Sequence, residues 1–298
     1  MSVTIPNPDD PVEKEYRRIE EQDDAALDDV NKWIKDNQAF AASGAGESPA
    51  ALNQRIRERF NIVRKAYTDF LERHPNHARG HLAFGGFLND TGDETGAAAE
   101  FEKALKIDPR MPAAWNNMGN YYGEYGPVTN AFSSYEKAIA ISPLEPLYYR
   151  NLATTVVVFR KDAREYYNID ETRVFDKALE LYGKARKLDP ENFELATDLA
   201  QTYYSLKPTR VEDALVAWTN ALKIAPTELQ REGVLVHLAR FKLFADRFAE
   251  SHHDLDAVTN ADLQDLKSRL LRNLDLREHP KATNPPPVVP APAGDKKN

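Results

Sequence analysis

Residues 78–109 read ARGHLAFGGFLNDTGDETGAAAEFEKALKIDP, and residues 112–143 read PAAWNNMGNYYGEYGPVTNAFSSYEKAIAISP. Placed one above the other, the two segments carry similar residues at the same places, 34 residues apart. A period of this length is typical of a helix–turn–helix unit that stacks on copies of itself. The small residues fall where two helices approach closely, so the pattern predicts an all-α fold for a steric reason. The matched pairs are Gly85 with Gly119, Leu88 with Tyr122, Ala97 with Ala131, Phe101 with Tyr135, Ala104 with Ala138, and Pro109 with Pro143.

The second segment carries the more complete motif. It reads W-N-N-M-G-N-Y-Y at residues 115–122 and A-F-S-S-Y-E-K-A-I at residues 131–139, and it closes with Pro143. These residues resemble the tetratricopeptide repeat (TPR) family, and the resemblance extends over residues 50–260. It implies a right-handed α-α superhelix, a solenoid of about four to five helix–turn–helix units with an N-terminal helix and a C-terminal capping helix. It also implies that a peptide or helix of another protein binds in a concave groove, without a cofactor.

The rest of the sequence divides around these units. We expect a disordered lead-in at residues 1–11, an N-terminal helix plus a degenerate repeat at residues 12–77, the solenoid at residues 78–260, a capping helix at residues 261–279 and a Pro-rich disordered tail at residues 280–298. Ser48 and Pro49 suit the N-cap and the first position of a helix, because the first amides of a helix lack partners.

The third unit contains an insertion at residues 160–172. From Ala153 to Ala178 the chain is 13 residues longer than between the matching Gly119 and Ala131. We expect a helical hairpin arm that projects from the solenoid, with Asp170 as the N-cap of its second helix. Tyr166 and Tyr167 on such an arm are candidate contacts for a partner, although the favoured interpretation is that they pack back on neighbouring helices. The β-branched run at residues 154–158 is predicted to stay helical, because stacking between repeats outweighs its strand propensity.

Composition narrows the function. The net charge of −8 argues against binding of nucleic acid through its phosphate backbone. The chain has no cysteine, which excludes thiolate metal sites and disulfides. The N-terminus has neither a basic start nor an apolar run, and no apolar segment is long enough to span a membrane. These features lead us to expect a cytoplasmic protein, although a mature fragment from which a leader has been removed would have the same features.

The resemblance also indicates which residues line the groove, since the first helix of each unit faces the ligand. Amide side chains suit a peptide partner because each can donate to and accept from its backbone. Asn117 and Asn151 occupy the same place in successive units. A plainer interpretation is that exposed helix faces are polar in any case. The predicted groove residues are Asn116, Asn117, Asn120, Arg150, Asn151, Thr154, Val158, Thr197, Asp198 and Gln201.

Other sites are less well supported by the sequence. The chain does not match the pattern of a clamp that binds an acidic C-terminal peptide, because Glu194 and Asp198 occupy places where such a clamp needs cations. Neither His74, His77 and His81 nor His252 and His253 follow a zinc spacing, so we predict no metal site. Three hypotheses follow, in order of support: an interaction scaffold, a component that self-associates into a homo-oligomer, and an enzyme with a site in the insertion.

Overall fold

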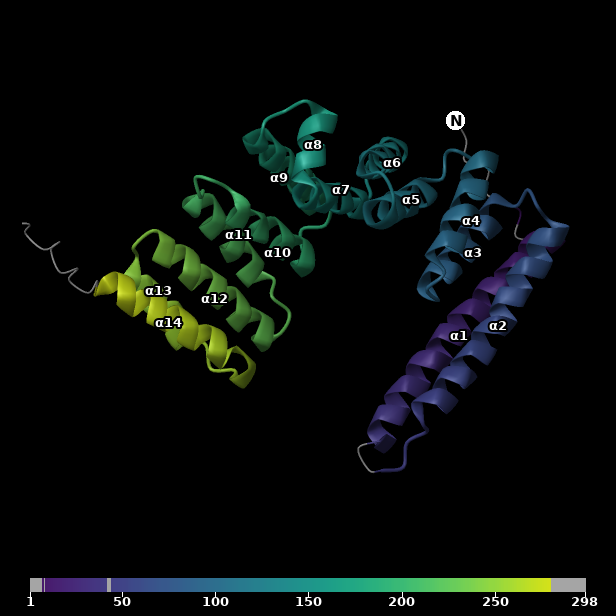
Figure 1. The fold of residues 1–298 in the computed structure, drawn as a ribbon, viewed down its shortest axis with the longest axis horizontal. Helices are drawn as coiled ribbons and strands as arrows, with labels where there is room; N and C mark the ends of the chain where they lie inside the picture. The colour runs from purple at the N-terminus through teal and green to yellow at the C-terminus, as the bar shows by residue number, and fades with distance from the viewer. Residues whose placement is uncertain (1–6, 8, 42–43, 280–298) are drawn as a thin grey trace, which may run out of the picture. The chain divides into compact units, whose positions relative to one another are not determined.

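A computed structural model describes residue 7, residues 9–41 and residues 44–279. Fourteen α-helices occupy most of this described part, and no strand occurs in it (Figure 1). The fold is an all-α TPR-type solenoid of paired helices. Most of the predicted lead-in and the whole Pro-rich tail lie outside the described residues.

The first two helices form a long antiparallel hairpin. Helix α1 covers Pro11–Ala41 and α2 covers Pro49–Arg73. Ser48 is the N-cap of α2, as its sequence predicts: its Oγ accepts a hydrogen bond from the amide of Ala51, and Pro49 follows it. Tyr67 and Phe70 of α2 are buried in one hydrophobic cluster with residues of α1 and α3.

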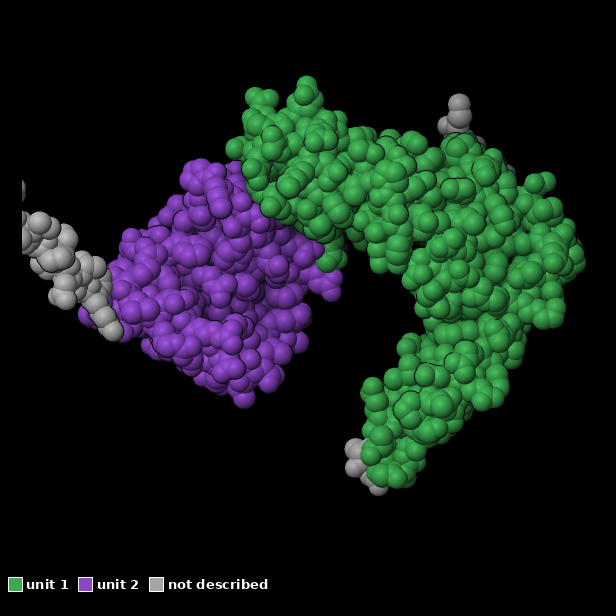
Figure 2. All heavy atoms as spheres, viewed as in Figure 1, with its two compact units in different colours: residues 1–188 green, residues 189–298 purple. Residues whose placement is uncertain are grey.

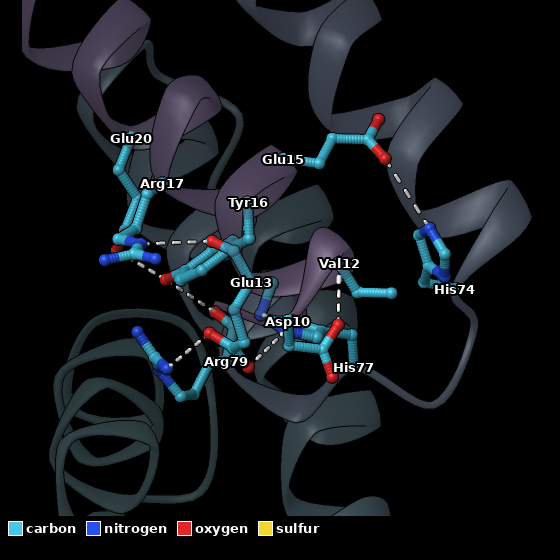
Figure 3. A network of polar contacts seen from close by, with 11 residues as sticks. Asp10, Val12, Glu13, Glu15, Tyr16, Arg17, Glu20, His74, His77 and Arg79 are labelled. Atoms are coloured by element: carbon cyan, nitrogen blue, oxygen red, sulfur yellow. Dashed lines mark hydrogen bonds and ion pairs between the residues drawn. The ribbon is translucent and has the colours of Figure 1, made fainter. Parts of the chain in front are cut away.

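A polar network fixes the start of α1 to the turn after α2 (Figure 3). Glu13 lies between Arg79, whose Nη1 is 2.9 Å from Oε2, and His77, whose Nε2 is 3.3 Å from Oε1. The other ring nitrogen of His77 accepts from the amide of Gly80 at 2.8 Å, so Nε2 carries the proton toward Glu13. Glu15 pairs with Arg73, which lowers the pKa of its carboxyl below the ordinary value.

The two regular repeats form the next four helices. They are α3 (Ala78–Asp90), α4 (Glu94–Ile107), α5 (Pro112–Tyr125) and α6 (Val128–Ile141). Gly92 turns the chain between α3 and α4 with a φ of +81°, a conformation that glycine adopts without strain. Gly119 of α5 lies against the ring of Tyr135 of α6, as the predicted close approach requires.

The third repeat pairs α7 (Pro146–Val158) with α9 (Glu171–Leu188) and inserts α8 (Arg160–Tyr167) between them. The β-branched run is helical, as predicted. Asp170 caps α9, because its Oδ1 accepts from the amide of Arg173 at 2.9 Å. The insertion differs from the projecting arm that we expected: α8 is a separate short helix that contacts α6, and its Ala163 is fully buried.

The same kind of hydrogen bond connects each hairpin in this part of the chain to the preceding one. The Nε2 of His81, the Nε1 of Trp115 and the hydroxyl of Tyr149 lie 3.0, 2.9 and 3.1 Å from the carbonyl oxygens of Pro75, Pro109 and Pro143, respectively. Donors and acceptors both repeat every 34 residues. Each ring therefore joins the first helix of its repeat to the loop that closes the preceding one.

The chain divides into two compact units, Met1–Leu188 and Asp189–Asn298 (Figure 2). The second unit contains α10 (Phe193–Thr202), α11 (Val211–Lys223), α12 (Glu228–Phe244), α13 (Phe248–Asp256) and α14 (Gln264–Glu278), with two short 3₁₀ turns at Tyr203–Ser205 and Ala261–Leu263. Leu270 and Leu274 of α14 are buried in a cluster with Val236, Ala239 and Leu255 of α12 and α13. Helix α14 thus covers this end of the second unit.

Candidate partner-binding groove

The predicted groove residues of the first unit lie on α5 and α7. Three of them are linked side chain to side chain, and we call Asn116, Asn117 and Asn151 the asparagine chain. Nδ2 of Asn151 donates to Oδ1 of Asn116 at 2.9 Å, and Nδ2 of Asn116 donates to Oδ1 of Asn117 at 3.5 Å. Asn116 is only 5% exposed, so it supports its two neighbours from below rather than facing a ligand.

The two outer amides of the asparagine chain have opposite roles in these hydrogen bonds. Asn151 donates to Asn116 through its nitrogen, whereas Asn117 accepts from Asn116 through its oxygen. Within the described part of the chain, the oxygen of Asn151 and the nitrogen of Asn117 take part in no hydrogen bond. The pair therefore presents one acceptor and one donor, the two functions that a peptide unit requires.

Four candidates of this unit remain, and neighbouring tyrosines hold two of them, Asn120 and Thr154. The hydroxyl of Tyr135 donates to Oδ1 of Asn120 at 2.8 Å, and burial raises the pKa of Tyr135 to about 12, which keeps it protonated. The hydroxyls of Thr154 and Tyr182 are 2.8 Å apart. Arg150 is half-buried, and Val158 is 59% exposed at the end of α7.

The other three candidates, Thr197, Asp198 and Gln201, lie on α10 in the second unit. The hydroxyl of Thr197 donates to the backbone oxygen of Glu194 at 2.8 Å, a bond within its own helix. Asp198 is half-buried and Gln201 is exposed. Within the first unit the structure brings Asn116, Asn117 and Asn151 together, whereas Thr197, Asp198 and Gln201 share one helix of the second unit.

Residues 57–112 match the family model of the tetratricopeptide repeat. The chain carries TPR repeats. The match covers the end of the N-terminal hairpin and the first regular repeat, and the second repeat has the fuller motif around Trp115, Gly119 and Pro143.

Solved structures with TPR repeats share the fold. YrrB, described as a TPR protein with an unusual peptide-binding site, is 17% identical, with 70% of this chain and 99% of that chain covered and a TM-score of 0.55. The pilF protein of Pseudomonas aeruginosa is 17% identical over 85% of this chain and 99% of its own, with a TM-score of 0.53. The C-terminal part of a TPR repeat-containing protein from Cytophaga hutchinsonii is 14% identical over 84% and 98%, with a TM-score of 0.56. At these identities the likeness shows the fold alone. The curated proteins provide no match to the sequence.

The two tyrosines of the insertion in this TPR chain point toward the preceding repeat. Their hydroxyls lie 3.0 Å (Tyr166) and 2.9 Å (Tyr167) from the carboxylate of Glu136 on α6. Their ring centroids are 5.2 and 5.7 Å from that of Phe132. Burial and the Glu136 hydrogen bond raise the pKa of Tyr166 to about 12, and burial raises that of Tyr167 as well. Both side chains therefore anchor α8 to α6.

A second group of polar residues was not predicted from the sequence. Nδ1 of His81 on α3 is 2.6 Å from Oε2 of Glu100 on α4, and Lys103 donates to Oε1 of the same carboxylate at 2.6 Å. Burial opposes ionisation of Glu100, but the hydrogen bonds from His81 and Lys103 outweigh it and lower its pKa. A pocket of about 430 Å³ lined by Leu71 and Phe84 opens above this group. In the sequence, His81 occupies the same place in its repeat as Trp115, 34 residues later. This match does not indicate that the His81 ring pairs with Glu100.

Two other structural features bear on function. Within residue 7, residues 9–41 and residues 44–279, no three histidine, cysteine, aspartate or glutamate side chains converge as metal ligands do. Among the helices of that same part of the chain, none combines the length and the apolar character needed to cross a membrane.

Proposed function

We propose that this TPR protein is an interaction scaffold that binds an extended segment of a partner protein across α5 and α7. TPR proteins act in general as scaffolds that bind proteins, which supports the class of function. The single observation that carries the binding site is the asparagine chain, with its donor at Asn117 and its acceptor at Asn151.

The chemistry of the site favours the backbone of the ligand over its side chains. A peptide carbonyl of the partner accepts from Nδ2 of Asn117, and a peptide N–H donates to Oδ1 of Asn151. Neither bond depends on the partner's sequence. Asn116 contributes indirectly: because it is buried and bonded to both neighbours, it fixes the direction in which each amide presents its donor or acceptor.

A peptide library provides the probe for this proposal. Peptides of about ten residues are selected on the full chain, and the affinity of the best binder is measured by fluorescence anisotropy. Two hydrogen bonds at about 0.5–1.5 kcal/mol each correspond to a loss of roughly 5- to 150-fold for Asn117→Ala with Asn151→Ala.

The matched control replaces Asn31 and Asn61, which are exposed amides on α1 and α2. The Asn31→Ala with Asn61→Ala protein should bind like the wild type. Equal affinity of both double variants would refute the groove, as would a library that yields no binder.

A further inference from the structure

The α1–α2 hairpin is longer than the repeat against which it packs. At 1.5 Å per residue, α1 is about 46 Å long and α2 about 37 Å, against about 20 Å for α3. The contacts with α3 come from the base of the hairpin, where Tyr67 and Phe60 meet Phe84 and Phe87. In Figure 1 the other end of α1 and α2 extends away from α3 and α4. The contacts described there join α1, α2 and the loop between them.

Six aromatic, aliphatic and charged side chains lie along one side of this hairpin, which we call the outer flank. Its α1 members are spaced by four and seven residues and its α2 members by four and three, so each set lies on one helix face. Two contacts join the sets: Arg59 to Asp29 at 2.9 Å, and the Arg55 guanidinium over the Trp33 ring at 4.0 Å. The outer flank consists of Asp29, Trp33 and Phe40 on α1 and Arg55, Arg59 and Ile62 on α2.

The outer flank faces away from α3. Ile62 follows Phe60 by two residues, which corresponds to about 200° around the helix, and Phe60 is the residue that contacts Phe87 of α3. Ile62 is 60% exposed and Phe40 is 58% exposed. Trp33, which lies under Arg55, falls between Ile62 and Phe40 along the hairpin, so the three side chains form a row. A row of large apolar side chains on one face indicates an interaction surface.

The residue types and charges of the hairpin favour a second copy of the same chain as the occupant. Tryptophan, phenylalanine and arginine are enriched in protein interfaces. Helix α1 has nine acidic and five basic residues, whereas α2 has six basic and three acidic ones. In the outer flank itself, the acidic Asp29 lies on α1 and the basic Arg55 and Arg59 lie on α2. A two-fold axis parallel to the helices can place the acidic member of each copy beside the basic members of the other. The same surface is then complementary to itself, as a symmetric dimer requires.

We infer that the chain forms a homodimer in which the outer flanks of two α1–α2 hairpins pack together. The available area is sufficient. The outer side of the hairpin, of which the outer flank is a part, runs the length of α2, about 37 Å, and two adjacent helices are about 20 Å wide. This side offers roughly 700 Å² per copy, which is close to the ~800 Å² that each partner buries in a standard stable interface. This dimer is independent of the groove on α5 and α7.

Light scattering coupled to gel filtration of the full chain, from about 1 to 100 µM, tests the inference. The wild type should elute with twice the chain mass, and Ile62→Glu should raise the dimer dissociation constant at least tenfold because the charge is buried twice. Ile62→Gln, a milder change, should raise it about fivefold. The control Val216→Glu places the same charge at a 62% exposed aliphatic on α11 and should leave the dimer intact.

Three results would overturn the inference: a monomeric wild type throughout this range, a dimer that Ile62→Glu and Ile62→Gln leave unchanged, or dissociation by Val216→Glu to the same extent. Circular dichroism establishes that each variant is folded. The Asn117→Ala with Asn151→Ala protein should remain dimeric, so failure of the groove and failure of the dimer are separate outcomes.

Discussion

Gly119 of α5 and Tyr135 of α6 approach so closely that there is no room for a methyl group. A Cβ at Gly119 would lie 2.5 Å from Cε1 of Tyr135. We predict that Gly119→Ala lowers the free energy of unfolding by about 1–3 kcal/mol, since the ring and its helix must shift. Thermal or urea unfolding measures the change.

Gly123 on the same helix provides the control, because a Cβ there would meet nothing within 4 Å. Alanine favours a helix by about 1 kcal/mol over glycine, so Gly123→Ala should leave stability unchanged or raise it. If both substitutions destabilise the protein equally, the steric explanation of the repeat pattern is wrong.

His237 in the second unit predicts a dependence of stability on pH. Its ring is stacked on Trp218 at 4.1 Å, and burial together with the nearby charge of Arg240 lowers its pKa to about 4 from an ordinary 6.5. Between these values the unfolded chain binds the proton and the folded chain does not. Stability therefore falls as the pH drops from about 6.5 to 4, by up to roughly 3 kcal/mol for this group.

The variant His237→Phe keeps an aromatic ring beside Trp218 and removes the titration. Urea unfolding at pH 7 and pH 4.5 should show a smaller loss of stability for this variant than for the wild type. His253→Gln, at an exposed histidine on α13, should behave like the wild type. An identical pH dependence in His237→Phe and the wild type would contradict the assignment.

Single residues also show where sequence reasoning stops. The spacing of Gly119, Tyr135 and Pro143 was sufficient to predict their packing, because the same steric solution occurs in two consecutive repeats. Asn116 was expected to face the groove with Asn117, yet it is buried. The place of Asn116 in the repeat indicates only roughly the direction in which its side chain leaves the helix. Whether a side chain at that place reaches solvent depends on Asn151, a neighbour 35 residues away.

At the level of elements, α8 is held to α6 by one carboxylate. Both Tyr166 and Tyr167 hydrogen-bond to Glu136, so Glu136→Ala removes the acceptor of both hydroxyls at once. We predict faster amide hydrogen exchange in α8, by roughly 5- to 150-fold for a local loss of about 1–3 kcal/mol, with α6 itself little affected.

Glu102 is the matched residue of the preceding repeat, 34 positions earlier, and its side chain is exposed near Lys106. Glu102→Ala should leave exchange in α8 unchanged. Unchanged protection of α8 in Glu136→Ala would show that the hydrogen bonds to Glu136 do not hold the helix.

The insertion explains why some elements were predictable and others were not. The helix ends at Ser48 and Asp170 follow from local capping chemistry, which a sequence displays directly. The direction of α8 depends on the contacts of Tyr166 and Tyr167 with α6, and the insertion occurs once, so no second copy reveals its packing. The hydrogen bonds from His81, Trp115 and Tyr149 to the loop prolines did have a repeated signal, at 34-residue spacing.

In the whole molecule, a repeat fold carries the site that we propose for a protein partner. The 34-residue period predicted the all-α TPR solenoid, because each hairpin buries its apolar face only against the next one. The identity of the partner does not follow from the sequence in the same way, because the asparagine chain presents a donor and an acceptor that any peptide backbone satisfies. A site that recognises a backbone therefore contains little information about the sequence of its ligand.

The most direct test of this backbone recognition is a double-mutant cycle between Asn151 and a selected peptide. Each peptide nitrogen is methylated in turn, which removes one N–H donor, and affinity is measured for the wild type and for Asn151→Ala. We expect one position where methylation weakens binding to the wild type at least fivefold but leaves binding to Asn151→Ala unchanged. Equal losses in both proteins at every position would contradict backbone recognition by Asn151.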